Sequence, residues 1–381
     1  MRIVDVRERS IPISRYADPD LPSGGLTTSL VAVRTDVLRE GRPVVGYGFS
    51  SIGRFAQSGL IHERFAPRLL AAPDAAQLDP FRAWEAMLHG EKPGGHGERC
   101  VAVGTLDMAI WDAAAKVAGL PLHRFLAVRL GRDTTSNPVP VYAGGGYPYP
   151  TDDVRRLTSE VRELLALGFE RVKIKVGAAP LAEDRRRIEA VLALLPGAWR
   201  LAVDAMNAYG PVEALGAAAE LDPYDLWWFE DVCDPHDFET LAAVAEAYRG
   251  PIAAGEALFS DAEAKLLDAY GGLHRDRDVL LFDPVHCYGL PGFLRIVDAL
   301  EGGGWPRSSF WPHGGHLWCL HVVAALGLGG AEVNPLSFWP VGGLSDGQAV
   351  RDGCAELPEA PGVGFETKAD LYALFRGLGE E

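Results

Sequence analysis

The sequence is poor in several patterns that would place it in other protein classes. Only five of its 381 residues are cysteines, they are scattered, and none forms a C-x-x-C pair, which favours a reduced, cytoplasmic setting. No apolar run approaches the ~20 residues of a membrane span, and no signal peptide is expected. Basic residues are outnumbered 36 to 52, so the net charge of −16 argues against nucleic acid or an anionic membrane as a partner. A small anionic substrate stays possible, because a metal ion and a few lysines can reverse the charge locally.

The first ~130 residues have the pattern of an α+β domain. Three β-branched, alternating stretches predict strands, and three longer apolar-periodic stretches predict helices. The predicted strands are 2–8, 27–35 and 44–49, and the predicted helices are 57–72, 79–89 and 99–118. A loop rich in Pro, Gly, Ser and Asp (15–26) joins the first two strands, and loops of this length are often functional.

From residue 139 the chain repeats a short apolar run followed by a helical stretch. A charged residue closes or follows each run, and these residues recur every 26 to 30 positions. That interval is about one strand, one helix and two loops, so we expect a parallel βα barrel. Helices are predicted at 151–167, 180–194, 211–220, 236–248, 260–270, 290–302 and 315–327. The best candidate for the eighth strand is Ala331–Val333, and the tail from about 340 is expected to return to the first domain.

Three carboxylates, Asp204, Glu230 and Glu256, follow three consecutive predicted strands. The carboxyl ends of barrel strands face one mouth, so these side chains should converge there. Converging carboxylates repel one another unless a cation neutralises them, and an all-oxygen set favours Mg²⁺. The alternative is that each one caps the helix that follows its strand.

Two lysines, Lys173 and Lys175, point the same way on the strand before Asp204. Beside a metal ion, a lysine should have a lowered pKa and can act as a general base. We assign that role to Lys175, because it lies nearer the mouth, and a tuning or carboxylate-binding role to Lys173. Without a metal, both would be ordinary charges at a strand end.

Asp283 and His313 lie at the ends of the next two predicted strands. An aspartate that accepts a hydrogen bond from one imidazole nitrogen leaves the other free to move protons. The pair is therefore a candidate acid–base dyad. The alternative is a histidine packed for structural reasons.

Together these residues resemble the enolase superfamily, mandelate racemase subgroup. The resemblance is carried by Lys173-Ile174-Lys175, Asp204, Glu230, Glu256, the Asp283–His313 pair and the stretch Leu106–Asp112. It implies a modified TIM barrel, (β/α)₇β, with an N-terminal α+β capping domain (1–134), a barrel (135–340) and a C-terminal segment packed on the cap (341–381). It also implies one Mg²⁺, abstraction of a proton α to a carboxylate to give an enediolate, and a homo-oligomer.

Within this subgroup, three stretches are most similar to D-tartrate dehydratases: 91–99, 255–260 and 312–316. The resemblance implies that Lys92 contacts substrate. Met206, Ala257 and Ile52 depart from the pattern, so the class of chemistry is better supported than tartrate as substrate. The candidate substrate contacts are Lys92, Ile52, Glu332 and His316.

The sequence thus predicts a Mg²⁺-dependent dehydratase of a hydroxy-diacid or acid sugar. Lys175 would remove the α-proton, and His313, oriented by Asp283, would protonate the leaving hydroxyl. One alternative is a racemase or epimerase of a hydroxy acid on the same scaffold. Another is a non-catalytic homologue that binds an acid.

Overall fold

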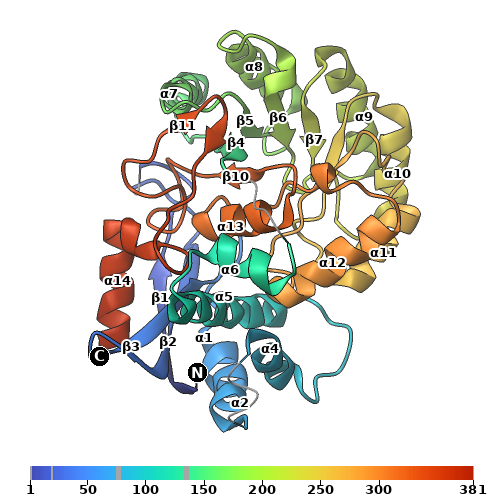
Figure 1. The fold of residues 1–381 in the computed structure, drawn as a ribbon. Coiled ribbons are helices and arrows are strands. Elements are labelled where there is room, and N and C mark those ends of the chain that lie inside the picture. Colours follow the sequence, from blue (N-terminus) through green and yellow to red (C-terminus); the bar gives the residue numbers. More distant parts are fainter. Residues whose placement is uncertain (1, 19, 74–78, 133–136, 381) are drawn as a thin grey trace.

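The computed structural model describes residues 2–18, 20–73, 79–132 and 137–380. A cap built from the N-terminal part of the chain lies against one end of a barrel, and the long helix α5 (Glu98–Ala118) lies between them (Figure 1). The predicted boundary between cap and barrel, 134/135, lies outside the described residues. The bounds of the three predicted domains stay predictions.

The cap contains an antiparallel sheet in the order β1–β2–β3. Its strands are β1 (Ile3–Pro12), β2 (Thr27–Arg39) and β3 (Arg42–Phe49). The helical segments that follow are α1 (Ser58–Leu60), the π-helical turn η1 (Ile61–Phe65), α2 (Ala66–Ala71), α4 (Pro80–Leu88), α5 and α6 (Leu122–Arg129). The predicted strands and helices of this region are confirmed, with bounds that differ by a few residues.

Helix α5 holds the cap, the barrel and the tail together. A Cβ added to Gly46 of β3 would lie 1.9 Å from the Ala109 carbonyl oxygen, so the strand packs directly on the helix backbone. Asp107 accepts a hydrogen bond from the Leu290 amide on the barrel side (2.7 Å). Asp112 accepts from the amides of Tyr47 in the cap and Val363 in the tail. These buried bonds fix the cap over the barrel, which positions the cap loops at the barrel mouth.

The barrel consists of parallel strands, of which the first six pair in chain order and the last pairs with the first. They are β4 (Val139–Gly144), β5 (Val172–Lys175), β6 (Leu201–Asp204), β7 (Trp228–Glu230), β8 (Ile252–Ala254), β9 (Val279–Leu280) and β10 (Ala331–Val333). The predicted eighth strand, Ala331–Val333, is confirmed as β10. The expected run Ser308–Pro312 forms no regular strand: it follows a 3₁₀ turn, η4 (Arg307–Ser309), and pairs with β9 by one bridge, Leu280 to Phe310.

Seven helices of the barrel region lie within a few residues of their predicted positions. They are α7 (Asp153–Ala166), α8 (Leu181–Leu192), α9 (Pro211–Leu221), α10 (Phe238–Ala247), α11 (Asp261–Tyr270), α12 (Leu290–Gly302) and α13 (Leu317–Leu326). Two 3₁₀ turns, η2 (Ala198–Arg200) and η3 (Asp222–Tyr224), precede β6 and β7. Inside the barrel, Tyr142, Trp228 and Leu281 belong to a separate buried apolar cluster.

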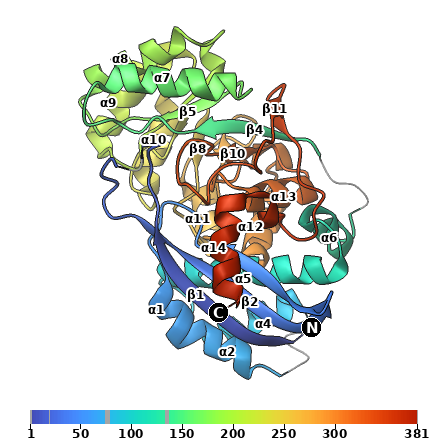
Figure 2. The same cartoon turned by 90° about the vertical axis from the view of Figure 1, so that its left-hand side faces the viewer.

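The C-terminal segment contacts both parts of the molecule. A small hairpin, β11 (Val350–Arg351) and β12 (Cys354–Ala355), pairs with the start of β4. A 3₁₀ turn, η5 (Phe365–Thr367), then leads into α14 (Ala369–Glu380), which runs beside the cap sheet (Figure 2). The Phe375 ring of α14 stacks on Tyr47 of β3, with centroids 4.8 Å apart, so the tail returns to the cap as predicted. Within the described part of the chain, no helix has the length and apolar character to cross a membrane.

Candidate active site

Three carboxylates meet at the mouth of the barrel. Asp204 ends β6 and Glu230 ends β7, and the two are register partners in the parallel pairing. Glu256 follows β8 by two residues. One oxygen from each carboxylate lies within 4.8 Å of the others. Asp204 and Glu230 are almost fully buried, at 1% and 0% exposure, so their charges are withdrawn from water and need a cationic partner.

These three carboxylates do not cap the helices that follow their strands. Helices α9, α10 and α11 have Gly210, Asp237 and Ser260 at their N-caps. The Glu256 Oε2 atom is buried and has no hydrogen-bond partner among the described residues. A buried acceptor without a partner, beside two further carboxylates and with no nitrogen or sulfur in the set, fits a hard divalent cation such as Mg²⁺.

Both candidate lysines point into this carboxylate cluster. Lys173 contacts Glu230, Glu332 (3.2 Å) and Asp204 (3.5 Å), and it is fully buried. Lys175 pairs with Asp204. Burial alone would lower the pKa of Lys175, but the Asp204 carboxylate outweighs it and raises the pKa above its ordinary value. The predicted lowering applies to a lysine beside a bound metal ion, so it stays a prediction.

Asp283 and His313 form the expected hydrogen-bonded pair. His313 Nδ1 lies 2.9 Å from Asp283 Oδ2, and its Nε2 lies 3.7 Å from Glu256 Oε2. Burial alone would lower the pKa of His313, but Glu256 and Asp283 together raise it to about 9. The imidazole is therefore charged near neutral pH, and its Nε2 faces the carboxylate cluster with a proton to donate.

Ser51 also holds this pair, and the sequence reasoning missed it. Its hydroxyl donates to Asp283 Oδ2 (2.6 Å) and lies 3.0 Å from Nε2 of His316. The Ser51 backbone has a φ of +59°, in the left-handed region that residues other than glycine rarely adopt. The only sequence signal was its place beside Ile52 and Gly53, in a turn predicted after the third strand.

A cavity of about 260 Å³ opens above these groups. Barrel residues and cap residues share its wall: Lys175, Glu256, His286, His313, Tyr147, Met206, Asn207, Ala257 and Phe338 from the barrel side, and Arg15, Leu26, Ile52, Gly53 and Arg54 from the cap. Its size suits a small ligand, since pockets for larger molecules begin near ~300 Å³. Both ring nitrogens of His286 are buried and lack a hydrogen-bond partner among the described residues, although Nδ1 lies 3.7 Å from Asp283 Oδ2.

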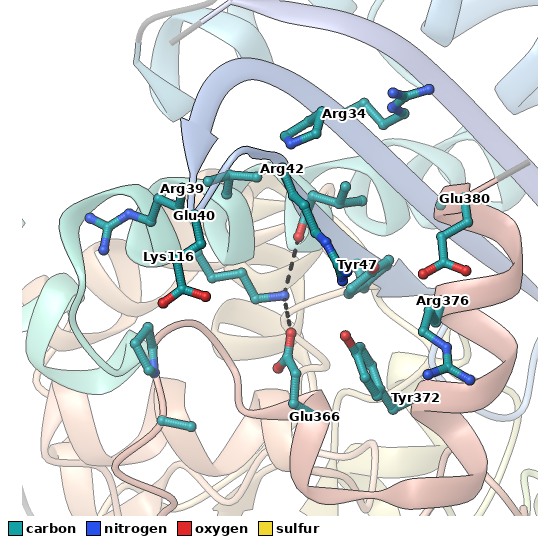
Figure 3. Close-up of a pocket in the computed structure, with 16 residues that line it drawn as sticks. Arg34, Arg39, Glu40, Arg42, Tyr47, Lys116, Glu366, Tyr372, Arg376 and Glu380 are labelled. Carbon is teal, nitrogen blue, oxygen red and sulfur yellow. Dashed lines mark hydrogen bonds and ion pairs between the residues drawn. The ribbon is translucent and has the colours of Figure 1, made fainter.

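A larger cavity, about 710 Å³, lies elsewhere, between the cap sheet and α14 (Figure 3). It also contains a lysine, Lys116 of α5. Lys116 contacts Asp112 (2.7 Å), Glu366 (2.7 Å) and the Val45 carbonyl (3.2 Å), so all three of its donors are engaged. The smaller cavity is the candidate site, because it is lined by Glu256 and His286, which have buried polar atoms without a hydrogen-bond partner among the described residues.

Residues 156–371 match the family model described as enolase C-terminal domain-like. The chain belongs to the enolase superfamily. It is 30% identical over 331 residues to L-talarate/galactarate dehydratase of Salmonella typhimurium, covering 84% of this chain and 76% of the relative. It is 25% identical over 342 residues to arabinonate dehydratase of Saccharolobus solfataricus, covering 87% of each. A solved structure of L-talarate dehydratase from Polaromonas sp. JS666, complexed with Mg and L-glucarate, has a TM-score of 0.76 at 26% identity, with 98% and 96% of the two chains covered.

The names of these superfamily relatives refer to acid sugars other than tartrate, so the resemblance to D-tartrate dehydratases stays a prediction. The four predicted substrate contacts lie in different places. Ile52 lines the cavity. Glu332 and His316 are buried beside it, against Lys173 and Ser51. Lys92 is exposed and is not part of the cavity wall.

Proposed function

We propose that this chain is a Mg²⁺-dependent dehydratase of a hydroxy acid of the acid-sugar or hydroxy-diacid type. The observation that carries the proposal is that Lys175 and the Asp283–His313 pair reach one small cavity beside three converging carboxylates. A base, an acid and an anion-stabilising site are the parts that β-elimination from a carboxylate substrate requires.

In this proposal Asp204, Glu230 and Glu256 hold the metal ion. When bound, Mg²⁺ supplies positive charge that stabilises the negative charge developing on the substrate carboxylate. Lys173, which contacts Glu230 and Glu332, adds a fixed positive charge behind the same carboxylates. The buried setting strengthens these interactions, because little water screens them.

Lys175 Nζ takes the α-proton, which leaves the electron pair of the C–H bond to form a carbon–carbon double bond. Its present contact with Asp204 must loosen first, because only a neutral amine can accept a proton. The β carbon–oxygen bond breaks as His313 Nε2 protonates the hydroxyl, which leaves as water. Asp283 accepts at Nδ1 and keeps Nε2 directed to the cavity. The enol product then tautomerises to a 2-keto acid.

A racemase or epimerase is the second candidate. Lys175 and His313 both line the cavity, so each has access to one face of a single carbon atom. Exchange of the α-proton with solvent deuterium in the unaltered protein, without loss of a hydroxyl, would favour this reading. If an acid binds tightly with Mg²⁺ but neither reaction occurs, the chain is a binding protein.

The test is turnover of an acid-sugar panel that includes D-tartrate, with Mg²⁺, followed by keto-acid formation. We expect at least one hydroxy-diacid or acid sugar to be dehydrated, and His313→Asn to slow the reaction by about 10²–10⁴-fold. Unchanged turnover in His313→Asn would remove His313 from its assigned role. Turnover that persists after metal chelation would contradict the proposed cofactor.

A further inference from the structure

The cap closes the cavity with two arginines, one from each of two loops. Arg15 follows β1, and Arg54 lies in the turn after β3. Glu256 is the single carboxylate in the described wall of the cavity, and it already belongs to the proposed metal-binding set. The cap side of the cavity is therefore cationic without a compensating acid, in a chain whose net charge is −16.

Arg54 has unused hydrogen-bonding capacity. Its guanidinium lies over the Phe259 ring, 4.7 Å from the centroid. A guanidinium stacked by its face keeps its N–H donors in its own plane, free to bind an anion from the edge. Within the described residues, the Arg54 side chain makes no ion pair and no hydrogen bond, although the group is partly buried.

Arg15 is more fully engaged. Its guanidinium donates to the Ser23 carbonyl oxygen (3.4 Å) and lies 5.4 Å from the centroid of the Tyr147 ring. Tyr147 in turn lies under Lys175, whose Nζ is 5.2 Å from the same ring. Arg15 is thus on the side of the proposed base. Arg54 is on the side of Phe259 and His286, and the ring centroids of these two residues are 5.5 Å apart.

We propose that Arg54 binds a second carboxylate, at the end of the substrate away from the metal, and so makes the enzyme select dicarboxylic over monocarboxylic acid sugars. The inference rests on the proposed function. A neutral –CH₂OH end would leave the Arg54 guanidinium without an anion, whereas a carboxylate matches two of its parallel donors. The His286 imidazole, whose nitrogens make no hydrogen bond within the described residues, offers a partner to a hydroxyl near the same end.

The test compares acids that differ at one end only: galactarate with galactonate, glucarate with gluconate, and D-tartrate with D-threonate. In the wild type we expect kcat/KM to favour one or more diacids by on the order of 100-fold. Arg54→Gln should remove most of that preference by raising KM for the diacid, and leave the monoacid nearly unchanged. Arg54→Lys keeps the charge but loses the paired donors, so its preference should be intermediate.

Arg295→Gln is the matched control. Arg295 also stacks on an aromatic ring, Trp84, at 4.6 Å from the centroid, but it does not line the cavity. This substitution should leave the preference at the wild-type value. Circular dichroism and the melting temperature of each variant show whether a loss of preference reflects a loss of fold.

Binding gives a readout that does not depend on turnover. Calorimetry with Mg²⁺ and Lys175→Ala, alone and combined with Arg54→Gln, measures the affinity for each acid of a pair. If nothing is turned over but diacids bind more tightly through Arg54, the proposed function fails and the role of Arg54 stands. Equal binding or turnover of diacids and monoacids in the wild type overturns the inference and leaves the dehydratase proposal intact. A preference for diacids that is lost in Arg15→Gln but kept in Arg54→Gln would also overturn the inference. The absence of binding of any diacid would overturn it as well.

Discussion

The barrel mouth and the groove between the cap and α14 each contain a lysine among carboxylates, yet they differ in whether the buried polar atoms have hydrogen-bond partners. Lys116 in the groove has three donors and three fixed acceptors. Burial alone would lower its pKa, but Asp112 and Glu366 raise it above the ordinary value. Lys175 at the mouth also has a raised pKa, through Asp204. The direction of the pKa shift therefore does not distinguish the two sites.

The partners do distinguish them. In the groove, Asp112 accepts from two backbone amides and from Lys116, so the cluster ties α5 to the cap and the tail. At the mouth, Glu256 Oε2 has no hydrogen-bond partner among the described residues. A saturated cluster stabilises the fold, whereas one with unpartnered buried atoms is built to receive something else. Cavity size alone would have favoured the groove as the functional site, since the groove is the larger of the two cavities.

The largest expected difference between the two sites is in turnover. Lys175→Ala should reduce kcat by about 10²–10⁴-fold, because the proposed base is lost. Lys116→Met should leave kcat near the wild-type value in protein that is still folded. The measurement is steady-state turnover of the best acid from the panel. A comparable loss in both variants would mean that the groove takes part in the chemistry.

Metal binding should depend on the mouth alone. Mg²⁺ at 100 times its Kd should stabilise the wild type by about 2.7 kcal/mol, because it binds the folded state only. Glu256→Gln should lose most of this effect, since one of three ligands is replaced. Glu366→Gln in the groove is the matched control and should keep it. The readout is the melting temperature with Mg²⁺ and with chelator. An unchanged Mg²⁺ effect in Glu256→Gln would exclude Glu256 as a ligand.

Lys116 should matter for stability. Lys116→Met leaves Asp112, which is fully buried, without its cation, so unfolding should become easier by about 3–5 kcal/mol. The measurement is chemical denaturation with and without the substitution. Equal midpoints would show that the groove cluster is not a structural tie.

The smallest effect is the pH dependence of this stability difference. The folded-state pKa of Lys116 is raised above 10.5, so its contribution to stability is fully present below pH 10.5. It is lost as pH rises through the folded-state pKa, because the amine then loses its proton in both states. The deficit of Lys116→Met should therefore be constant between pH 8 and about 10 and shrink at higher pH. A deficit that grows with alkali would reverse the assigned sign.

The sequence predicted the parts of the site that follow from periodicity. Asp204, Glu230 and Glu256 were located because each follows a parallel strand at a regular interval, and parallel strand ends share one face. The predicted seventh barrel strand, 308–312, is not a regular strand in the structure. Its run contains Pro312 and includes a 3₁₀ turn, so it pairs with β9 by one bridge.

Contacts made by the cap could not be predicted in this way. Ser51 and Arg54 reach the mouth only because α5 fixes the cap over the barrel, an arrangement that no local pattern encodes. The glycine-rich loop that carries Lys92 was expected to reach the substrate. In the structure Arg64, Arg68 and Arg99 surround Glu91 of this loop and Lys92 is exposed, so its contact with substrate stays a prediction. The pairing of Lys175 with Asp204, which raises the pKa of the lysine in this structure, is visible only in three dimensions.

The most direct test of the central claim is incorporation of deuterium at the α-carbon of an acid substrate, in D₂O with Mg²⁺. His313→Asn should still exchange this proton, because it keeps Lys175 and the carboxylates but cannot complete the elimination. Lys175→Ala should exchange none. Exchange in Lys175→Ala at the rate of His313→Asn would contradict the account, since the proton would then be removed by another group.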